Sequence, residues 1–179
     1  ASLSTRDGLA LSFDAEGCPA GLTVDGRPLL GSSPGGMWLR DVAADGPWLR
    51  PTLHRRDDPD ATVFSGSEPQ AGLELTSRWE ANGTGIDVQA TIRDLTGKDR
   101  AVTAYFVLPV ADLPWVWHND LLTSTPAAEG SEYLNASGWP ISGISSAYPF
   151  CSITTENAGL SVSVPMDCPR VFRLAYNGT

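Results

Sequence analysis

The fold class follows from one stretch, IDVQATIRD, which occupies residues 86–94. Every second residue in it is apolar, and these are Ile86, Val88, Ala90 and Ile92. The residues between them are polar, and these are Asp87, Gln89, Thr91 and Arg93. Because successive side chains of a β-strand point to opposite faces, this alternation predicts a strand with one buried face and one solvated face.

The same period of two continues on both sides of this strand. It recurs in LELTSRW (73–79), AVTAYFVLP (101–109), FCSITT (150–155) and LSVSVPM (160–166). The dipeptides Asp25-Gly26 and Asn82-Gly83 are typical of tight hairpin turns. No stretch of about a dozen residues shows the helical period without Gly or Pro. We therefore predict an all-β fold, an antiparallel β-sandwich of roughly nine or ten strands with few or no helices.

The length of 179 residues fits one domain of ordinary size, so we expect a single β-sandwich domain over residues 1–179. Two polar, turn-rich stretches, residues 50–70 and 123–149, are expected as long loops, which are often functional. The chain ends in FRLAYNGT directly after a predicted strand, which is compatible with the N-terminal part of a longer protein.

The charge balance excludes two classes of partner. Twelve basic against 21 acidic residues give a net charge of −9. Nucleic acids and anionic membranes both need a basic face, so we expect neither as a partner. The sequence also has no apolar run long enough to span a bilayer. Uncharged sugars remain compatible with this composition.

Cysteine and acidic residues give no metal signature. Three cysteines are present, namely Cys18, Cys151 and Cys168, and their pairing is left open. There is no CxxC motif and no Cys/His cluster, which argues against zinc. The acidic stretch RRDDPDAT (55–62) lacks the EF-hand spacing and is interpreted as a solvated loop rather than a calcium site. We therefore expect no metal and no cofactor.

Three tripeptides have the pattern of N-glycosylation acceptors, and they begin at Asn82, Asn135 and Asn177. The chain also contains a single lysine, Lys98. Both features favour an extracellular or secreted protein.

The stretch LPWVWHND (113–120) concentrates residue types that bind sugars. In one interpretation Trp115 and Trp117 form a platform for a sugar ring, and His118, Asn119 and Asp120 hydrogen-bond its hydroxyl groups. In the other, the indoles fill the space between sheets and the polar residues end the strand and start a turn. Trp139 lies among small residues in the following stretch, either as an anchor or exposed to a ligand. The candidate carbohydrate-binding residues are thus Trp115, Trp117, His118, Asn119, Asp120 and Trp139.

A second aromatic stretch, GGMWLRDVAADGPWLRP (35–51), contains two further tryptophans. Its Arg40 stands beside Asp41, which is usually the mark of a structural ion pair. The alternative is that Arg40 or Asp41 reaches a sugar hydroxyl.

Three segments together resemble a known domain family. They are LALSFDAEGCPAGLTVDGRPLL (9–30), WEANGTGIDVQATIRDLTGKDRAVTAYFVLPV (79–110) and AYPFCSITTENAGLSVSVPMDCPRVFRLAYN (147–177). In strand order and turn pattern the chain resembles, from Gly8 to Tyr176, the galactose-mutarotase-like supersandwich found N-terminal to the catalytic barrel of large glycoside hydrolases.

The resemblance implies an accessory domain of a carbohydrate-active enzyme. Such a domain supports a catalytic domain, in the same or an associated chain, and can contact the oligo- or polysaccharide. True mutarotases use a histidine and a glutamate, but neither His54 nor His118 lies in a matching motif, so no catalytic residue is carried over. The domain is thus not expected to be catalytic on its own.

Two alternatives stay open. A free-standing carbohydrate-binding module is suggested by the six tryptophans. A small mutarotase-like or glycosidic enzyme would need two carboxylates about 5–9.5 Å apart. The sequence offers Asp41, Asp120, Glu129 and Glu132 for that purpose, and their spacing along the chain does not tell which would meet. The sugar itself is not identified.

Overall fold

The computed structural model describes residues 1–138, 145–146, 148–167 and 171–178. Within these ranges all regular structure is β-strand, the strands pair antiparallel, and no helix occurs. The predicted all-β, sandwich-type fold is confirmed. The chain divides into two compact units, Ala1–Ala111 and Asp112–Thr179. The expected single domain over residues 1–179 stays a prediction.

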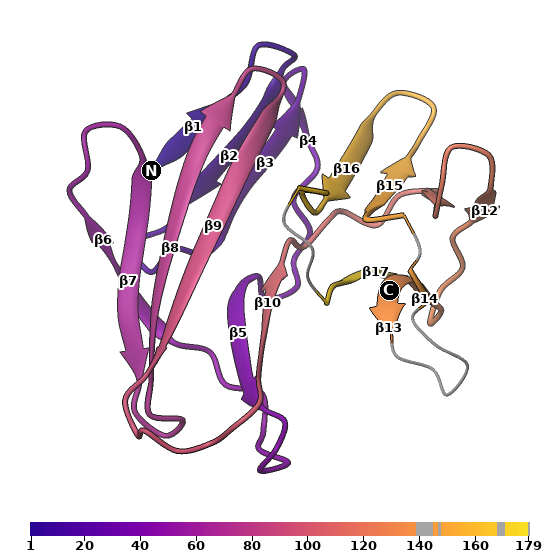
Figure 1. Ribbon diagram of the computed structural model, residues 1–179. Helices are drawn as coiled ribbons and strands as arrows, with labels where there is room; N and C mark the ends of the chain where they lie inside the picture. Colours follow the sequence, from indigo (N-terminus) through magenta and orange to yellow (C-terminus); the bar gives the residue numbers. More distant parts are fainter. Residues whose placement is uncertain (139–144, 147, 168–170, 179) are drawn as a thin grey trace. The chain divides into compact units, whose positions relative to one another are not determined.

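The first unit contains three antiparallel sheets (Figure 1). One has the order β1-β2-β3-β4, with strands Ser2–Ser4, Leu9–Phe13, Pro19–Val24 and Arg27–Pro28. The second has the order β6-β7-β8-β9, with strands Thr52–Arg56, Thr62–Glu68, Leu73–Asn82 and Gly85–Asp94. The third pairs β10 (Val102–Val107) with β5 (Gly36–Asp41).

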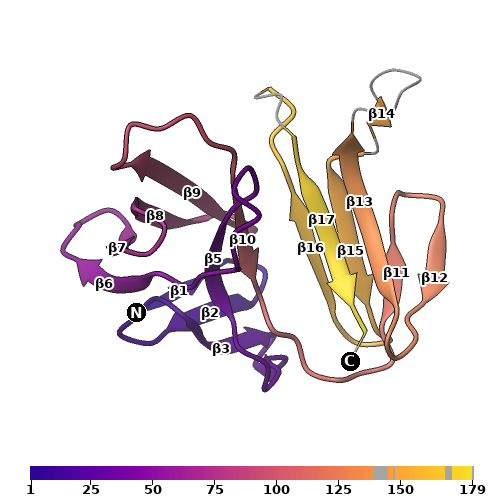
Figure 2. The same cartoon turned by 90° about the horizontal axis from the view of Figure 1, so that it is seen from below.

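An aromatic cluster joins these sheets into one core. Phe13 of β2 contacts Phe64 of β7 and Trp79 of β8, with ring centroids 5.4 and 4.8 Å apart. Trp79 in turn meets Phe106 of β10 edge-on at 4.7 Å. Phe13, Phe64 and Trp79 are all buried. Figure 2 shows the β1–β4 and β6–β9 sheets as separate layers of this unit.

The stretch that predicted the fold, residues 86–94, forms β9 and pairs with β8 over ten residues without a bulge. Its apolar row lies on the same face as Leu75 and Trp79, as the pleat requires. However, this face is only partly covered: Val88 is 43% exposed. The physical reason is position, because β9 is the last strand of its sheet and has a neighbour on one side only within the part of the chain that the structure describes.

The prediction that residues 50–70 and 123–149 are long loops is wrong in part. Residues 50–70 contain β6 and β7, and Phe64 of β7 is fully buried. Residues 123–149 contain β12 (Ser124–Pro126), β13 (Glu132–Gly138) and β14 (Ser145–Ser146). Pairing with neighbouring strands holds these five strands extended, although their own sequences carry little apolar alternation.

The second unit contains two sheets. One has the order β12-β11-β15-β16, in which β11 is Val116–His118, β15 is Phe150–Thr154 and β16 is Gly159–Ser163. The other has the order β14-β13-β17, in which β17 is Arg173–Asn177. Buried side chains from both sheets form its core, among them Trp115, Trp117, Asn135, Cys151 and Ile153.

Candidate functional site

The tryptophans of LPWVWHND lie in the core of the second unit. Trp115 is 1% exposed and Trp117, in β11, is 3% exposed. Trp117 stands opposite Ile153 of β15 and lies 6.1 Å from the ring of Tyr133, which continues to Tyr176 at 6.2 Å. A platform for a sugar needs an open ring face, so this burial favours the core-filling interpretation of both indoles.

The polar residues that follow have structural partners. The Nε2 atom of His118 lies 2.8 Å from the Thr154 hydroxyl, and the carbonyl of Asn119 accepts a hydrogen bond from Asn135 at 2.6 Å. The Asp120 carboxylate accepts the backbone N–H groups of Leu122 and Thr123 at 2.7 and 2.6 Å. These backbone hydrogen bonds lower the pKa of Asp120, as expected of a carboxylate that caps a turn. Trp139 lies outside the described residues.

The three sequon asparagines differ in accessibility. Asn82 is exposed in the β8–β9 turn, where its Nδ2 donates to Asp87 at 2.9 Å. Asn135 is 4% exposed, and the nitrogen to which a glycan would attach donates to the carbonyls of Asn119 and Phe150. Asn177 is exposed at the end of β17, while Thr179 of its sequon lies outside the described residues.

Two of the three cysteines are described, and both are free thiols. Cys18 and Cys151 are buried and neither forms a disulfide, although the Cys18 sulfur accepts a hydrogen bond from Arg50. Burial raises the pKa of the Cys151 thiol to about 11, so it is protonated at neutral pH. Cys168 lies outside the described residues.

A different surface brings aromatic side chains together with one face open. Strands β5 and β10 pair so that Trp38 stands directly opposite Tyr105. Met37 and Leu39 of β5 are buried, whereas Trp38 and Arg40 point to the opposite face. A backbone bridge between Leu39 and Leu49, with both N–H···O bonds at 2.8 Å, brings Trp48 alongside β5 at the edge that does not pair with β10.

We call this surface the aromatic groove; it is a cavity of about 390 Å³ lined by Pro34, Trp38, Trp48, Tyr105 and Val107. Trp48 is 39% exposed and lies nearly parallel to Tyr105, with ring centroids 4.8 Å apart and planes inclined by 24°. The indole nitrogen of Trp38 is buried and, among the described residues, has no hydrogen-bond partner. The groove thus combines stacked rings, an apolar lining and an unsatisfied donor.

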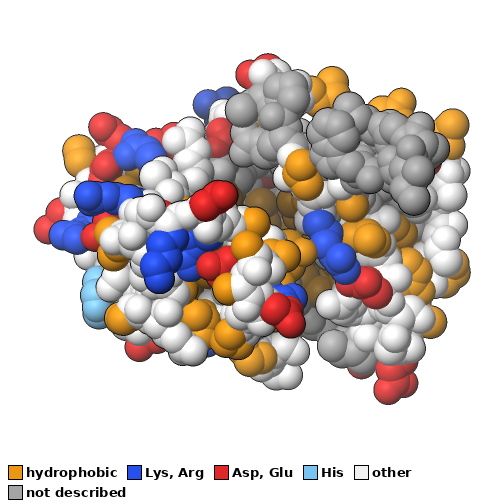
Figure 3. Space-filling view, turned by 60° about the horizontal axis from the view of Figure 1, so that its bottom comes forward, with side chains coloured by type: hydrophobic (Ala, Val, Ile, Leu, Met, Phe, Trp, Pro, Cys, Tyr) orange, Lys and Arg blue, Asp and Glu red, His pale blue; other side chains and the backbone are white. Residues whose placement is uncertain are grey.

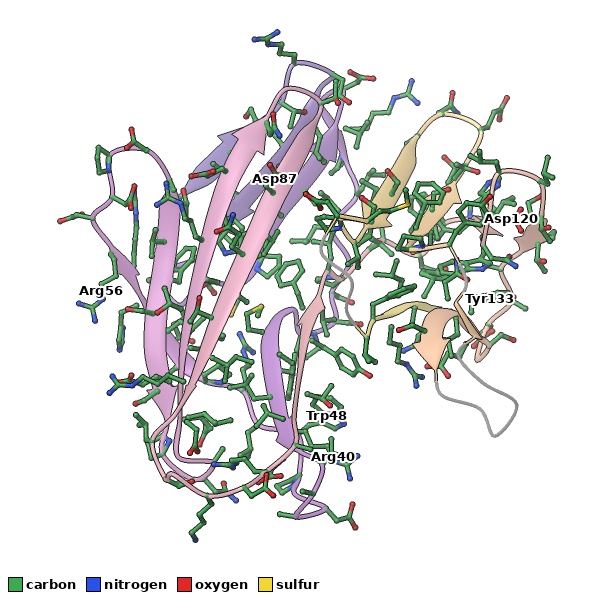
Figure 4. The ribbon with its side chains drawn as sticks, viewed as in Figure 1. Arg40, Trp48, Arg56, Asp87, Asp120 and Tyr133 are labelled. Carbon is green, nitrogen blue, oxygen red and sulfur yellow. The ribbon has the colours of Figure 1, made fainter. Side chains whose placement is uncertain are left out.

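Arg40 stands at the rim of the aromatic groove, beside Trp48 (Figure 4). Its guanidinium carbon lies 6.0 Å from the centre of the Trp48 ring. Its Nε donates to the carbonyl of Gly46 at 2.7 Å and its Nη2 pairs with Asp45 at 2.6 Å. Figure 3, which brings the lower end of Figure 1 forward, shows hydrophobic side chains exposed among charged ones.

Asp41 belongs to a separate ion-pair network rather than to Arg40. Arg100 pairs with Asp41 and with Asp94, both at 2.9 Å, and its side chain is largely buried. The Arg100 hydrogen bond lowers the pKa of Asp94 to about 2. Asp41 and Arg100, together with Lys98 and Asp99, line a second cavity of about 360 Å³. Because the Arg100 guanidinium is hydrogen-bonded to both carboxylates, this network holds the β9–β10 connection to β5.

The other acidic residues also have structural contacts or lie in solvent. Asp58 of the acidic stretch accepts the N–H groups of Asp60 and Ala61 at 3.0 Å and pairs with Arg78 at 2.7 Å. Glu132 pairs with Arg173 at 2.5 Å, and Glu129 is exposed. Among the described residues, no group of three or more metal-binding side chains gathers. No helix long and apolar enough to cross a membrane occurs in those residues either.

Comparison with known proteins finds no matching family, no matching curated protein and no matching solved structure. Trp38, Arg40 and Trp48 belong to the second aromatic stretch of the sequence and are not among the predicted sugar-binding residues, and neither is Tyr105. The alternation of AVTAYFVLP, which places Tyr105 and Val107 on one face, was the signal available in the sequence.

Proposed function

We propose that this chain is an accessory β-sandwich domain of a carbohydrate-active, glycoside hydrolase-like enzyme, and that it contacts the glycan through the aromatic groove. The observation that carries the proposal is the partly exposed indole of Trp48, stacked on Tyr105 above an apolar cavity. Sugar rings present apolar C–H faces that pack on such rings. This site differs from LPWVWHND, whose indoles are buried.

The composition of the groove suits a neutral glycan. The groove is shallow and open, and its lining is mainly apolar, as in ligand sites where a few polar groups orient the ligand. Arg40 supplies such a group, because among the described residues its Nε–H and one Nη2–H are used by Gly46 and Asp45 and its other N–H donors have no partner. An acidic chain with apolar, uncharged walls at this site favours uncharged hydroxyl-bearing ligands.

The alternatives differ in what accompanies this groove. A free-standing carbohydrate-binding module would use the same surface without a catalytic domain. A small mutarotase-like or glycosidic enzyme is less well supported, because Asp41, Asp120 and Glu132 are held by Arg100, by backbone N–H groups and by Arg173. The extracellular location and the glycosylation remain proposals from the sequons.

Calorimetric titration with a panel of soluble neutral oligosaccharides tests the proposal. We expect at least one member to bind, and Trp48→Ala to weaken its binding about tenfold, because ring stacking and ring burial are both lost. Trp48→Phe, which keeps an aromatic ring on Tyr105, should lose less. The matched control is His118→Ala, which changes the other candidate site.

Two results would contradict the proposal. One is that no oligosaccharide of the panel binds to the unmodified chain. The other is that His118→Ala weakens binding while Trp48→Ala does not, which would place the sugar-binding site at LPWVWHND instead of the aromatic groove. Thermal unfolding of each variant separates loss of binding from loss of folding.

A further inference from the structure

The edge of β9 is an unusually open surface for strand pairing. Strand β9 has ten residues and, among the described strands, is hydrogen-bonded to β8 alone. Edge strands of stable monomers are commonly protected by prolines, lysines, bulges or short length. Residues 85–94 contain no proline and no lysine, and their register with β8 is unbroken.

The opposite edge of the same sheet is protected, which makes the contrast informative. Strand β6 has five residues, and His54, Arg55 and Arg56 in it are exposed. Figure 4 shows Arg56 on β6 directed away from the sheet and Asp87 on β9. Another strand could therefore add to this sheet at β9 far more easily than at β6.

The backbone groups that β9 presents at its open edge can be assigned from the ladder. Leu95 donates its N–H to the carbonyl of Gly72 at 2.9 Å, so odd-numbered residues point their backbone groups toward β8. The N–H and C=O groups of Val88, Ala90 and Ile92 consequently point outward. No backbone hydrogen bond other than those of the β8–β9 ladder is formed by residues 85–94 within the described chain.

From this edge we propose that the chain self-associates through β9, which pairs antiparallel with β9 of a second copy about a two-fold axis at Ala90. The proposal goes beyond the sugar-binding function and does not depend on it. A two-fold axis perpendicular to the sheet keeps each face on its own side, so inward residues must oppose inward residues. In the register centred on Ala90, Val88 lies opposite Ile92 of the second copy, and Ile92 lies opposite Val88 of the second copy.

Charge complementarity selects this register. It places Asp87 opposite Arg93 of the second copy, twice by symmetry, in non-hydrogen-bonded pairs where side chains are closest. Registers centred on Gln89 or Thr91 place Asp87 opposite Thr91 or Leu95 instead and lose both charge pairs. Of these three registers, only the one centred on Ala90 pairs opposite charges and also places apolar residues opposite apolar residues.

The side chains that would pair are only loosely engaged within the chain. Arg93 lies 3.3 Å from Glu74, and both side chains are largely exposed, so this surface contact contributes little. Asp87 accepts one hydrogen bond from Asn82. The pairing adds about six hydrogen bonds over the three central residue pairs and covers the exposed side of Val88. It also closes the assembly at two copies, because it uses the open edge of β9 in both.

Sedimentation velocity of the 179-residue chain over a concentration series tests this inference. We expect a monomer–dimer equilibrium and no larger species. Asp87→Arg should raise the dimer dissociation constant about tenfold or more, because both charge pairs become repulsive. The double variant Asp87→Arg/Arg93→Asp restores opposite charges and should return the constant to within about threefold of the unmodified chain.

A backbone variant provides a second, independent test. Because the N–H of Ala90 points away from β8, Ala90→Pro leaves the β8–β9 ladder intact and blocks the new one, so dimer should be lost. Thermal unfolding confirms that each variant is folded; if Asp87→Arg is not, Arg93→Asp alone tests the same repulsion. A chain that stays monomeric over the whole series would overturn the inference. So would a dimer that neither Asp87→Arg nor Ala90→Pro weakens, or a double variant that fails to recover.

Discussion

Replacing Asn135 by alanine tests how the two sheets of the second unit are held together. Asn135 lies on β13, and its buried Nδ2 donates to the carbonyl of Asn119, just after β11, and to that of Phe150 in β15, both at 2.6 Å. One amide group therefore clamps the β13–β17 sheet to the β11–β15 sheet. Asn135→Ala removes both hydrogen bonds and leaves two partly buried carbonyls without a donor.

The expected cost follows from those two bonds. Each contributes about 0.5–1.5 kcal/mol net, and an acceptor left unsatisfied in a buried site costs about 1–3 kcal/mol. Because Asn119 and Phe150 are only half-buried, water can reach part of each carbonyl. We expect Asn135→Ala to lower the free energy of unfolding by about 2–3 kcal/mol, a large share of the about 5–15 kcal/mol typical of a domain.

Asn135→Asp tests the same pair of hydrogen bonds through the pH dependence of the free energy of unfolding. When ionised, the new carboxylate faces two carbonyl oxygens and cannot donate, so its pKa in the folded state is raised above the unfolded value of about 3.9. A group with a raised folded pKa stabilises the fold below the unfolded pKa and loses that contribution as the pH rises through the folded pKa. This variant should therefore be less stable than Asn135→Ala at pH 7, with a deficit that shrinks toward pH 4.

Chemical unfolding in urea, monitored by tryptophan fluorescence at both pH values, measures these differences. Asn82→Ala is the matched control, because this sequon asparagine is exposed and its loss should change stability by about 0.5 kcal/mol or less. An Asn135→Ala variant as stable as Asn82→Ala would contradict the proposed role of the two Asn135 hydrogen bonds. So would an Asn135→Asp variant whose stability has the same pH dependence as that of the unmodified chain.

Two further predictions concern the first unit. The pKa of Asp94 is lowered to about 2 by Arg100, so its contribution is present above the unfolded pKa of 3.8 and is lost as the pH falls toward 2; Asp94→Asn should flatten the fall in Tm over that window. Trp79 is buried against Phe106, so Trp79→Ala should cost about 3–5 kcal/mol in urea unfolding, whereas Trp48→Ala, at a partly exposed indole, should cost less than half of that.

The alternation of apolar and polar residues in the sequence was sufficient to predict a strand where that alternation is regular. IDVQATIRD forms the predicted strand, and Asn82-Gly83 stands at the turn before it. The alternation did not predict strands that are held extended mainly by pairing with their neighbours. An example is β7, whose sequence is TVFSGSE and in which Phe64 is buried. Pattern also could not tell a central strand from an edge strand. The apolar row of β9 was predicted to be buried, and its exposure depends on which neighbours the chain supplies.

The different environments of the tryptophans explain why the candidate site was not apparent from sequence proximity. Trp115 and Trp117 are close to polar residues in the sequence, yet both are buried. Trp48 and Tyr105 are far apart in the sequence and meet through the pairing of β5 with β10 and the bridge from Leu39 to Leu49. Such long-range register is fixed by the whole fold and is not encoded in any one segment.

The outward position of Trp48 is itself the strongest physical reason to look for a ligand there. Stacking on Tyr105 contributes about 0.5–1.5 kcal/mol beyond burial, whereas full burial of a large apolar side chain contributes about 1.5–3 kcal/mol or more. Stability alone would therefore favour Trp48 in a core position, like Trp79. A stacked pair left open beside an unsatisfied Trp38 nitrogen instead has the features of a contact surface, because a ligand can cover the rings. The affinity of the Trp48 variants for sugars measures that gain directly.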